Sequence, residues 1–326
     1  MSDNAICSTA HGRIKLFSGT GCPALAAEIS QHLGIPLSGR DVIQYPNETI
    51  LVRLHESIRG QDVFLIQATS SPVNHNIMEM LISLDALKRA SPDRITVVIP
   101  YFSYGRFDRK DQPRVPITAR LLADMIGAAG ADRYILLDLH ADQIQGFFNI
   151  PGDVMTVFPI LADYFREKKL QDAVVVSADL GFAKKARNLA AELNMPLALI
   201  EKRREAKGTE ALTLVGDVQN CDIIIVDEEV DTGGTMVNAV DIVKKHGAHD
   251  VYLCFAHAFL SPPAADRLRK LPLKEIVTTN SVPIPPEKQI PNLTVLSVAG
   301  LLGEVIQRVH EGCSVGEVFR RYQRYE

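Results

Sequence analysis

The chain has 326 residues, of which 46% are hydrophobic, so it can form two domains with substantial cores. Its formal net charge of −4 gives no electrostatic basis for binding nucleic acid. It has neither an apolar run of membrane-spanning length nor a basic-then-apolar N-terminus, which argues against a membrane span and a secretory signal. The five cysteines are scattered without a CxxC pair, as reduced thiols would be, so we expect a cytoplasmic protein.

Short apolar runs alternate with helical patterns along the chain. Most runs are continuously apolar, as parallel strands covered on both faces are. A helix is expected after the second run, with Ser71 as its capping residue and Pro72 in the first helical position. The predicted strands span residues 13–17, 63–68, 95–100, 134–137, 173–176, 223–226 and 251–255.

This alternation predicts a doubly wound α/β fold with mostly parallel sheets. Pro151 and Gly152 interrupt the pattern, which places a boundary near residues 150–157. We therefore expect two related domains, residues 1–155 and 156–326. The last predicted helix, about residues 299–310, is expected to pack back on the first domain.

The strongest chemical signal is residues 223–235, where a buried strand leads into four acids within five residues, a Gly-rich turn and a helix. Ligands of such sheets bind at the carboxyl ends of the strands, and glycines let backbone N–H groups approach a phosphate at a helix N-terminus. Asp227 and Asp231 are placed to accept hydrogen bonds from sugar hydroxyls or from hydrated Mg²⁺. A plain capped helix would explain a Thr before the glycines but not the acids. The expected phosphate-binding residues are Thr232, Gly233, Gly234 and Thr235.

This segment resembles the phosphoribosyl loop of type I phosphoribosyltransferases, with Glu228 in place of a second Asp. Other segments narrow the resemblance to the ribose-phosphate pyrophosphokinase family and extend it over nearly the whole chain. That family implies a phosphoribosyltransferase-like fold and transfer of the pyrophosphoryl group of ATP to the 1-hydroxyl of ribose 5-phosphate with Mg²⁺. It also implies a homohexamer with ATP sites shared between subunits. The segments are 56–60, 78–81, 99–110, 138–148 and 201–204.

The resemblance also implies roles for individual residues. Lys202 and Arg204 match the catalytic cations, and the polar stretch 205–210 after them is typical of a mobile lid. His140 and Asp179 match a Mg²⁺ site, while Asp227 and the loop after it match the site of ribose 5-phosphate. The residues implied in ATP binding are Tyr45, Asn47, Glu48, Thr49, Arg106, Phe107 and His140.

Ser57, Arg59 and Ser314, termed the predicted phosphate cluster, match a regulatory phosphate site of the family. The family usually has a second Ser where this chain has Gly316, so we expect phosphate activation to be weak or absent. Three alternatives stay open at this point. They are a non-catalytic regulatory paralogue, an enzyme of the same reaction with relaxed nucleotide choice (suggested by Phe107 and Thr49), and a plain phosphoribosyltransferase.

Overall fold

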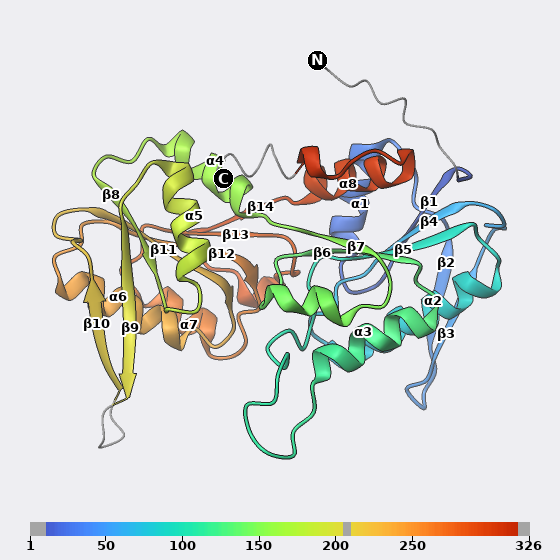
Figure 1. Cartoon of the computed structure of the whole chain (residues 1–326), viewed down its shortest axis with the longest axis horizontal. Coiled ribbons are helices and arrows are strands. Elements are labelled where there is room, and N and C mark those ends of the chain that lie inside the picture. The colour runs from blue at the N-terminus through green and yellow to red at the C-terminus, as the bar shows by residue number, and fades with distance from the viewer. Residues whose placement is uncertain (1–10, 205–209, 319–326) are drawn as a thin grey trace. The chain divides into compact units, whose positions relative to one another are not determined.

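The computed structural model describes residues 11–204 and 210–318, with residues 202–204 and 210–211 described by their backbone alone. These residues form two compact units (Figure 1). Unit 1 contains residues 11–156, 281–283 and 297–318, and unit 2 contains residues 157–204, 210–280 and 284–296.

Unit 1 is built on a five-stranded sheet in which all neighbouring strands are parallel. Its elements are β1 (Ile14–Ser18), α1 (Pro23–Leu33), β2 (Arg40–Gln44), β3 (Ile50–Leu54), β4 (Asp62–Ile66), α2 (Val73–Arg89), β5 (Arg94–Ile99), α3 (Thr118–Ala129), β6 (Arg133–Leu137), the 3-10 helix η1 (Asp142–Phe147), β7 (Gly152–Met155) and α8 (Ala299–Glu311). The strand order is β1-β4-β5-β6-β7, and β2 and β3 form a separate antiparallel pair. Helices α1 and α8 lie on one side of this sheet and α2 and α3 on the other (Figure 1).

Unit 2 is built on a seven-stranded sheet that is parallel except at one edge. Its elements are α4 (Phe158–Lys168), β8 (Ala173–Ser177), α5 (Ala183–Leu193), β9 (Leu197–Arg204), β10 (Glu210–Val215), β11 (Asp222–Val230), α6 (Gly234–Lys245), β12 (Val251–Ala258), α7 (Ala264–Arg269), β13 (Glu275–Thr279), the 3-10 helix η2 (Pro286–Lys288) and β14 (Leu293–Leu296). The strand order is β10-β9-β8-β11-β12-β13-β14, and only β10 is antiparallel to its neighbour. Helix α4 packs on α5, and α6 packs on α7.

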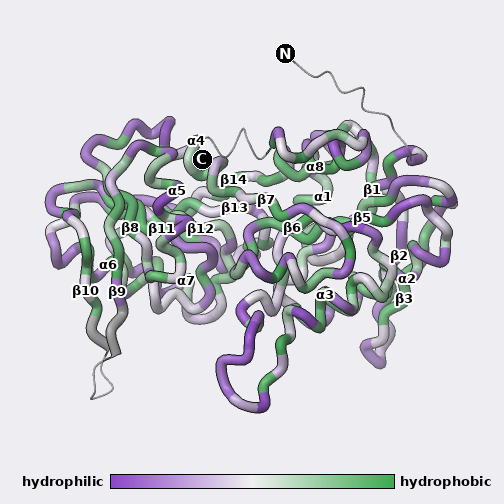
Figure 2. The backbone as a smooth tube through the Cα atoms, viewed as in Figure 1, coloured by the Kyte–Doolittle hydropathy of each residue, from purple (hydrophilic) through white to green (hydrophobic). Residues whose placement is uncertain are grey.

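The central strands are apolar because both of their faces are covered. Every residue of β4, β8 and β12 is buried, which is the pattern of parallel strands between two helical layers. The hydrophobic colouring of β8, β11 and β12 in Figure 2 follows these strands through the interior of unit 2. The predicted α/β class with mostly parallel sheets is confirmed.

The start of α2 differs from the prediction. Pro72, not Ser71, is the N-cap, and no side chain caps this helix. Pro72 has an extended backbone (φ −76°, ψ 107°), and its carbonyl accepts the first helical hydrogen bond from the Asn76 amide at 3.0 Å. The helix therefore begins one residue later than the Ser-Pro pattern indicates.

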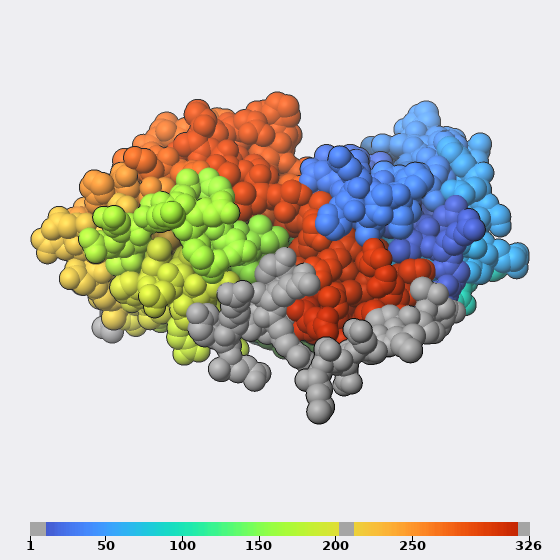
Figure 3. Space-filling view, turned by 90° about the horizontal axis from the view of Figure 1, so that it is seen from above, coloured from blue at the N-terminus to red at the C-terminus, as the bar shows by residue number. Residues whose placement is uncertain are grey.

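Helix α8 packs against α1, although the two are far apart in sequence (Figure 3). The helices approach so closely that a Cβ built on Gly303 would lie 2.5 Å from Cδ2 of His32. The end of α8 is tied to buried Asp62, which accepts hydrogen bonds from His310 Nδ1 at 2.8 Å and from Arg94 Nη2 at 2.6 Å. The last helix therefore belongs to unit 1.

Two sequence-based expectations concern the thiols and the membrane. Cys22, Cys221 and Cys254 are free, as expected. Cys313 is disulfide-bonded, so the expectation of a reduced thiol is wrong at that position. Among the described helices, none combines the length and hydrophobicity that crossing a membrane requires.

Candidate functional site

The predicted phosphate loop joins β11 to α6 in unit 2. Gly233 is the N-cap of α6 and has a left-handed backbone (φ 76°, ψ 3°) that residues with a side chain rarely adopt. No side chain caps the helix, so Thr232 is not the capping residue that a plain helix start would need. The first-turn N–H groups of a helix have no intrahelical partner, and the helix dipole adds positive potential there. This turn is therefore suited to an anion.

Three of the four acids, Asp227, Glu228 and Glu229, lie on β11 itself, which extends to Val230, four residues beyond the predicted end of the strand. The extension is stabilised by pairing with β12, where Glu229 is opposite His257. Burial raises the pKa of Asp227 to about 7; the amide of Glu228, which donates to Oδ1 at 2.8 Å, opposes this rise, and the charge of Asp179 adds to it. Near neutral pH this carboxyl is poised to gain a proton or a cation.

Asp179 reaches the same edge of the sheet from the neighbouring strand. It follows β8, whose Ser177 is opposite Val226 of β11. Its Oδ1 accepts a hydrogen bond from the Phe182 amide at 2.9 Å, which fixes the turn that leads into α5. The structure therefore places Asp179 near Asp227, which lies on the strand next to β8.

Lys185, which sequence reasoning did not single out, neutralises part of this acidic edge. Its Nζ donates to Oε2 of buried Glu228 at 2.8 Å and lies 5.7 Å from the centre of the Phe182 ring. The pair joins the first turn of α5 to the acidic part of β11. No local pattern signals it, because the partners are 43 residues apart.

Lys202 and Arg204 lie on β9, which runs parallel to β8 and antiparallel to β10. The pairing with β8 ends at Leu199, so both residues lie beyond the end of β8, at the edge where Asp179 is found. Figure 1 shows β9 and β10 continuing past β8. The predicted lid lies outside the described residues except for Glu210, which begins β10 and is therefore part of a strand.

In unit 1, two motifs of the predicted ATP site adjoin. His140 is exposed and follows β6, and the loop that carries Arg106 lies against it. A Cβ built on Gly105 would lie 3.4 Å from the Cβ of His140. Phe107, beside Arg106, is 54% exposed. His140, Arg106 and Phe107 thus lie on one surface of unit 1.

The remaining predicted ATP residues form the exposed tip of the β2–β3 hairpin. The Tyr45 amide donates to the Thr49 carbonyl at 2.9 Å, and the Thr49 hydroxyl donates to Asn47 Oδ1 at 2.7 Å. Glu48 has a left-handed backbone (φ 67°) within this turn. Tyr45 is 45% exposed, as a loop that contacts another molecule would be.

The members of the predicted phosphate cluster, as far as the structure describes them, do not bond to one another. The Ser314 hydroxyl accepts from the Gly316 amide at 3.2 Å, and the Arg59 carbonyl accepts from Gln61 at 3.4 Å. Across residues 11–204 and 210–318, no hydrogen bond or ion pair joins Ser57 or Arg59 to Ser314. The cluster stays a prediction.

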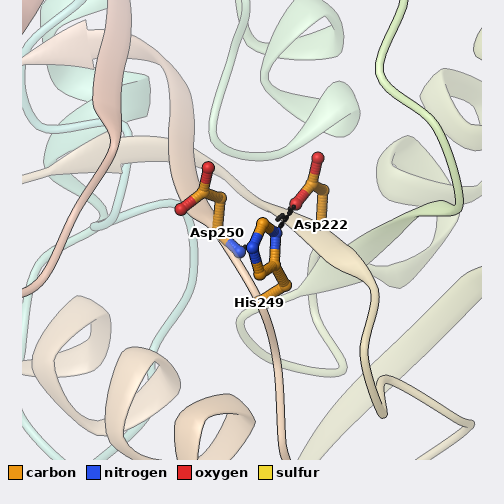
Figure 4. Close-up of side chains that lie close together, drawn as sticks. All are labelled: Asp222, His249 and Asp250. Carbon is orange, nitrogen blue, oxygen red and sulfur yellow. Dashed lines mark hydrogen bonds and ion pairs between the residues drawn. The ribbon is translucent and has the colours of Figure 1, made fainter.

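A different group has the spacing of a metal site. Asp222, His249 and Asp250 have ligand atoms within 4.8 Å of one another (Figure 4). They lie at the amino ends of β11 and β12, away from the phosphate loop. Each already has a protein partner: His249 Nδ1 bonds Asp222 at 2.8 Å, and Lys274 pairs with Asp250 at 3.1 Å. We assign no metal to this group. His140 and Asp179, the predicted ligands, belong to units 1 and 2, respectively.

Comparison with known proteins agrees with this arrangement. Residues 14–130 match the family model of the N-terminal domain of ribose phosphate pyrophosphokinase, and residues 202–320 match a phosphoribosyl synthetase-associated domain. A ribose-phosphate pyrophosphokinase of Caldanaerobacter subterraneus is 50% identical over 94% of this chain and 98% of the relative. One from Synechococcus elongatus is 47% identical over 94% of each chain. The crystal structure of phosphoribosylpyrophosphate synthetase from Mycobacterium smegmatis matches with a TM-score of 0.88 and 41% identity, covering 92% of this chain and 99% of that chain. The chain belongs to the ribose-phosphate pyrophosphokinase family.

Proposed function

We propose that this enzyme transfers the pyrophosphoryl group of ATP to the 1-hydroxyl of ribose 5-phosphate, giving 5-phosphoribosyl 1-pyrophosphate and AMP. The observation that carries the proposal is the uncapped turn at Gly233, which follows directly after the acids of β11. Such a turn provides a phosphate site and sugar-binding acceptors on consecutive residues.

Ribose 5-phosphate would bind at the start of α6. Its phosphate would accept hydrogen bonds from the N–H groups and hydroxyls of residues 232–235. Asp231 and Asp227 would accept hydrogen bonds from the ribose hydroxyls. This orientation would present the 1-hydroxyl to the β-phosphorus of ATP. The hydroxyl oxygen would form the new bond to that phosphorus, and the bond to the bridging oxygen of AMP would break in line with it.

Lys202 and Arg204 would stabilise the negative charge that develops during this transfer. Phosphoryl-type transfers depend on positioning and charge neutralisation rather than on covalent help from the protein. The backbone of β9 extends past β8 at the edge that carries Asp179, which supports this role. ATP would lie along Arg106, Phe107 and His140.

The acidic edge of unit 2 also fits Mg²⁺, which prefers oxygen ligands. Asp227 is partly buried near Asp179, and burial, with the charge of Asp179 adding to it, raises its pKa to about 7. Asp179 and, by family resemblance, His140 would hold the ion. When bound, Mg²⁺ would neutralise phosphate oxygens of the substrates.

The family also suggests a homohexamer in which the Tyr45–Thr49 tip contacts ATP of a neighbouring subunit. The exposure of this tip supports that suggestion. The cytoplasmic location inferred from sequence stays a prediction, as does the absence of nucleic-acid and membrane partners.

The test is an assay with ATP, ribose 5-phosphate and Mg²⁺ that measures AMP, repeated with GTP and CTP. We expect AMP formation that requires ribose 5-phosphate, and loss of saturation by ribose 5-phosphate in Asp231→Ala. The alternative considered from the sequence is a non-catalytic regulatory paralogue. An intact chain that forms no AMP would establish that alternative, and equal rates with GTP or CTP would establish relaxed nucleotide choice.

A further inference from the structure

Arg267 of α7 contacts the phosphate loop from behind. Its Nη1 donates a hydrogen bond to the Thr232 carbonyl at 2.9 Å, across 35 residues of sequence. The same nitrogen lies 3.8 Å from the position that a Cβ on Gly234 would occupy. In the described part of the chain, no carboxylate forms an ion pair with exposed Arg267, and its guanidinium bonds the loop through the Thr232 carbonyl.

This hydrogen bond fixes the orientation of one peptide unit. In a trans peptide, the carbonyl of one residue and the N–H of the next point in opposite directions. Because Arg267 holds the Thr232 carbonyl toward α7, the N–H of Gly233 is directed away from α7. The two consecutive glycines allow many other backbone orientations, including ones that would turn the carbonyl oxygen toward a bound anion.

We propose that Arg267 is a positioning residue for ribose 5-phosphate. It locks the Thr232–Gly233 peptide so that the Gly233 N–H faces the 5-phosphate, and it draws the repulsive carbonyl oxygen to the opposite side. The guanidinium also adds positive potential to that of the helix N-terminus. This inference rests on the proposed function, because it assumes that the loop binds the 5-phosphate.

Helix α7 supplies a matched control. Lys270, at the C-cap of the same helix, is exposed and carries the same charge, but among the described residues its side chain forms no hydrogen bond to the loop. Lys270→Met therefore removes one positive charge from the same helix and leaves the Thr232 carbonyl bond in place. Arg267→Lys keeps a donor and a charge, so it is the conservative variant.

The experiment measures ribose 5-phosphate binding to the full chain by calorimetry, together with KM and kcat for each substrate. We expect Arg267→Met to raise the Kd and KM for ribose 5-phosphate about tenfold or more, as the loss of one charge-assisted hydrogen bond does. The KM for ATP and the melting temperature should stay near wild type. Arg267→Lys should recover much of the affinity, and Lys270→Met should match wild type.

Three outcomes would overturn the inference. The first is wild-type ribose 5-phosphate binding in Arg267→Met. The second is an equal effect in Lys270→Met, which would show a general effect of charge. The third is a parallel loss of ATP and ribose 5-phosphate saturation with a lowered melting temperature, which would show a folding defect. If the wild-type chain itself bound no ribose 5-phosphate, the proposed function would fail and the inference with it.

Discussion

Asp227→Asn should make the unliganded protein more stable at neutral and alkaline pH while it impairs catalysis. A rise of the Asp227 pKa from 3.8 to about 7 corresponds to about 4 kcal/mol of unfavourable free energy for the buried charge, at 1.36 kcal/mol per tenfold change in proton affinity. Asn is neutral and can still accept the hydrogen bond from the Glu228 amide. Relaxation around the site reduces the gain, so we expect an increase of about 1–3 kcal/mol in the free energy of unfolding at pH 8.

The sign of the pH dependence makes this prediction specific. Between pH 3.8 and about 7 the folded state binds more protons at Asp227 than the unfolded state does, so this group lowers stability as the pH rises. Urea unfolding with a chelator present should therefore show wild type and Asp227→Asn converging near pH 4.5 and diverging toward pH 8. Asp241→Asn, at an exposed position on α6, is the control and should show no such divergence.

Two results would refute this reasoning. One is a constant difference between wild type and Asp227→Asn at all pH values. The other is a variant that is less stable than wild type at pH 8. Either result would mean that groups of the protein itself stabilise the negative charge of Asp227 when no cation is bound.

The remaining predictions concern other parts of the enzyme. Lys202→Ala should lower turnover about 100-fold or more without changing the melting temperature; a variant that keeps over half the wild-type rate would exclude Lys202 from the mechanism. His140→Ala should raise the concentration of Mg²⁺ and ATP needed for half-maximal rate, and an unchanged dependence would make His140 structural. Lys185→Met should reduce the free energy of unfolding by about 1–3 kcal/mol in urea, because it removes a cation that pairs with the buried Glu228 carboxylate. Adding Glu228→Gln should restore part of that loss, and no recovery would contradict the pairing. In a phosphate titration of initial rate at constant ionic strength we expect little activation, and a steep rise at low millimolar phosphate would show that the predicted phosphate cluster suffices without a hydroxyl at Gly316.

The sequence predicted seven of the parallel strands because their apolar runs are continuous and rich in β-branched residues, but it did not predict β7, β9, β13 or β14. It did not predict that β11 includes Asp227 and Glu229, since acids are unfavourable in strands and only pairing with β12 explains their place. The glycines marked the phosphate loop because the backbone at Gly233 needs a positive φ. The roles of Lys185 and Arg267 could not be predicted from the sequence, because each residue contacts its partner only through the tertiary fold and no local pattern indicates the contact.

The packing of α8 on α1 has a consequence for how the chain acquires its structure during synthesis. Residues 284–296 of unit 2 are made before residues 299–311 of α8. Helix α1 of unit 1, by contrast, is made early and can pack against α8 only after α8 has left the ribosome. Until then, α1 lacks the helix that packs against it in the finished unit. Newly made chains therefore pass through a stage with an uncovered apolar face, in which chaperones or a second nascent chain can compete for it.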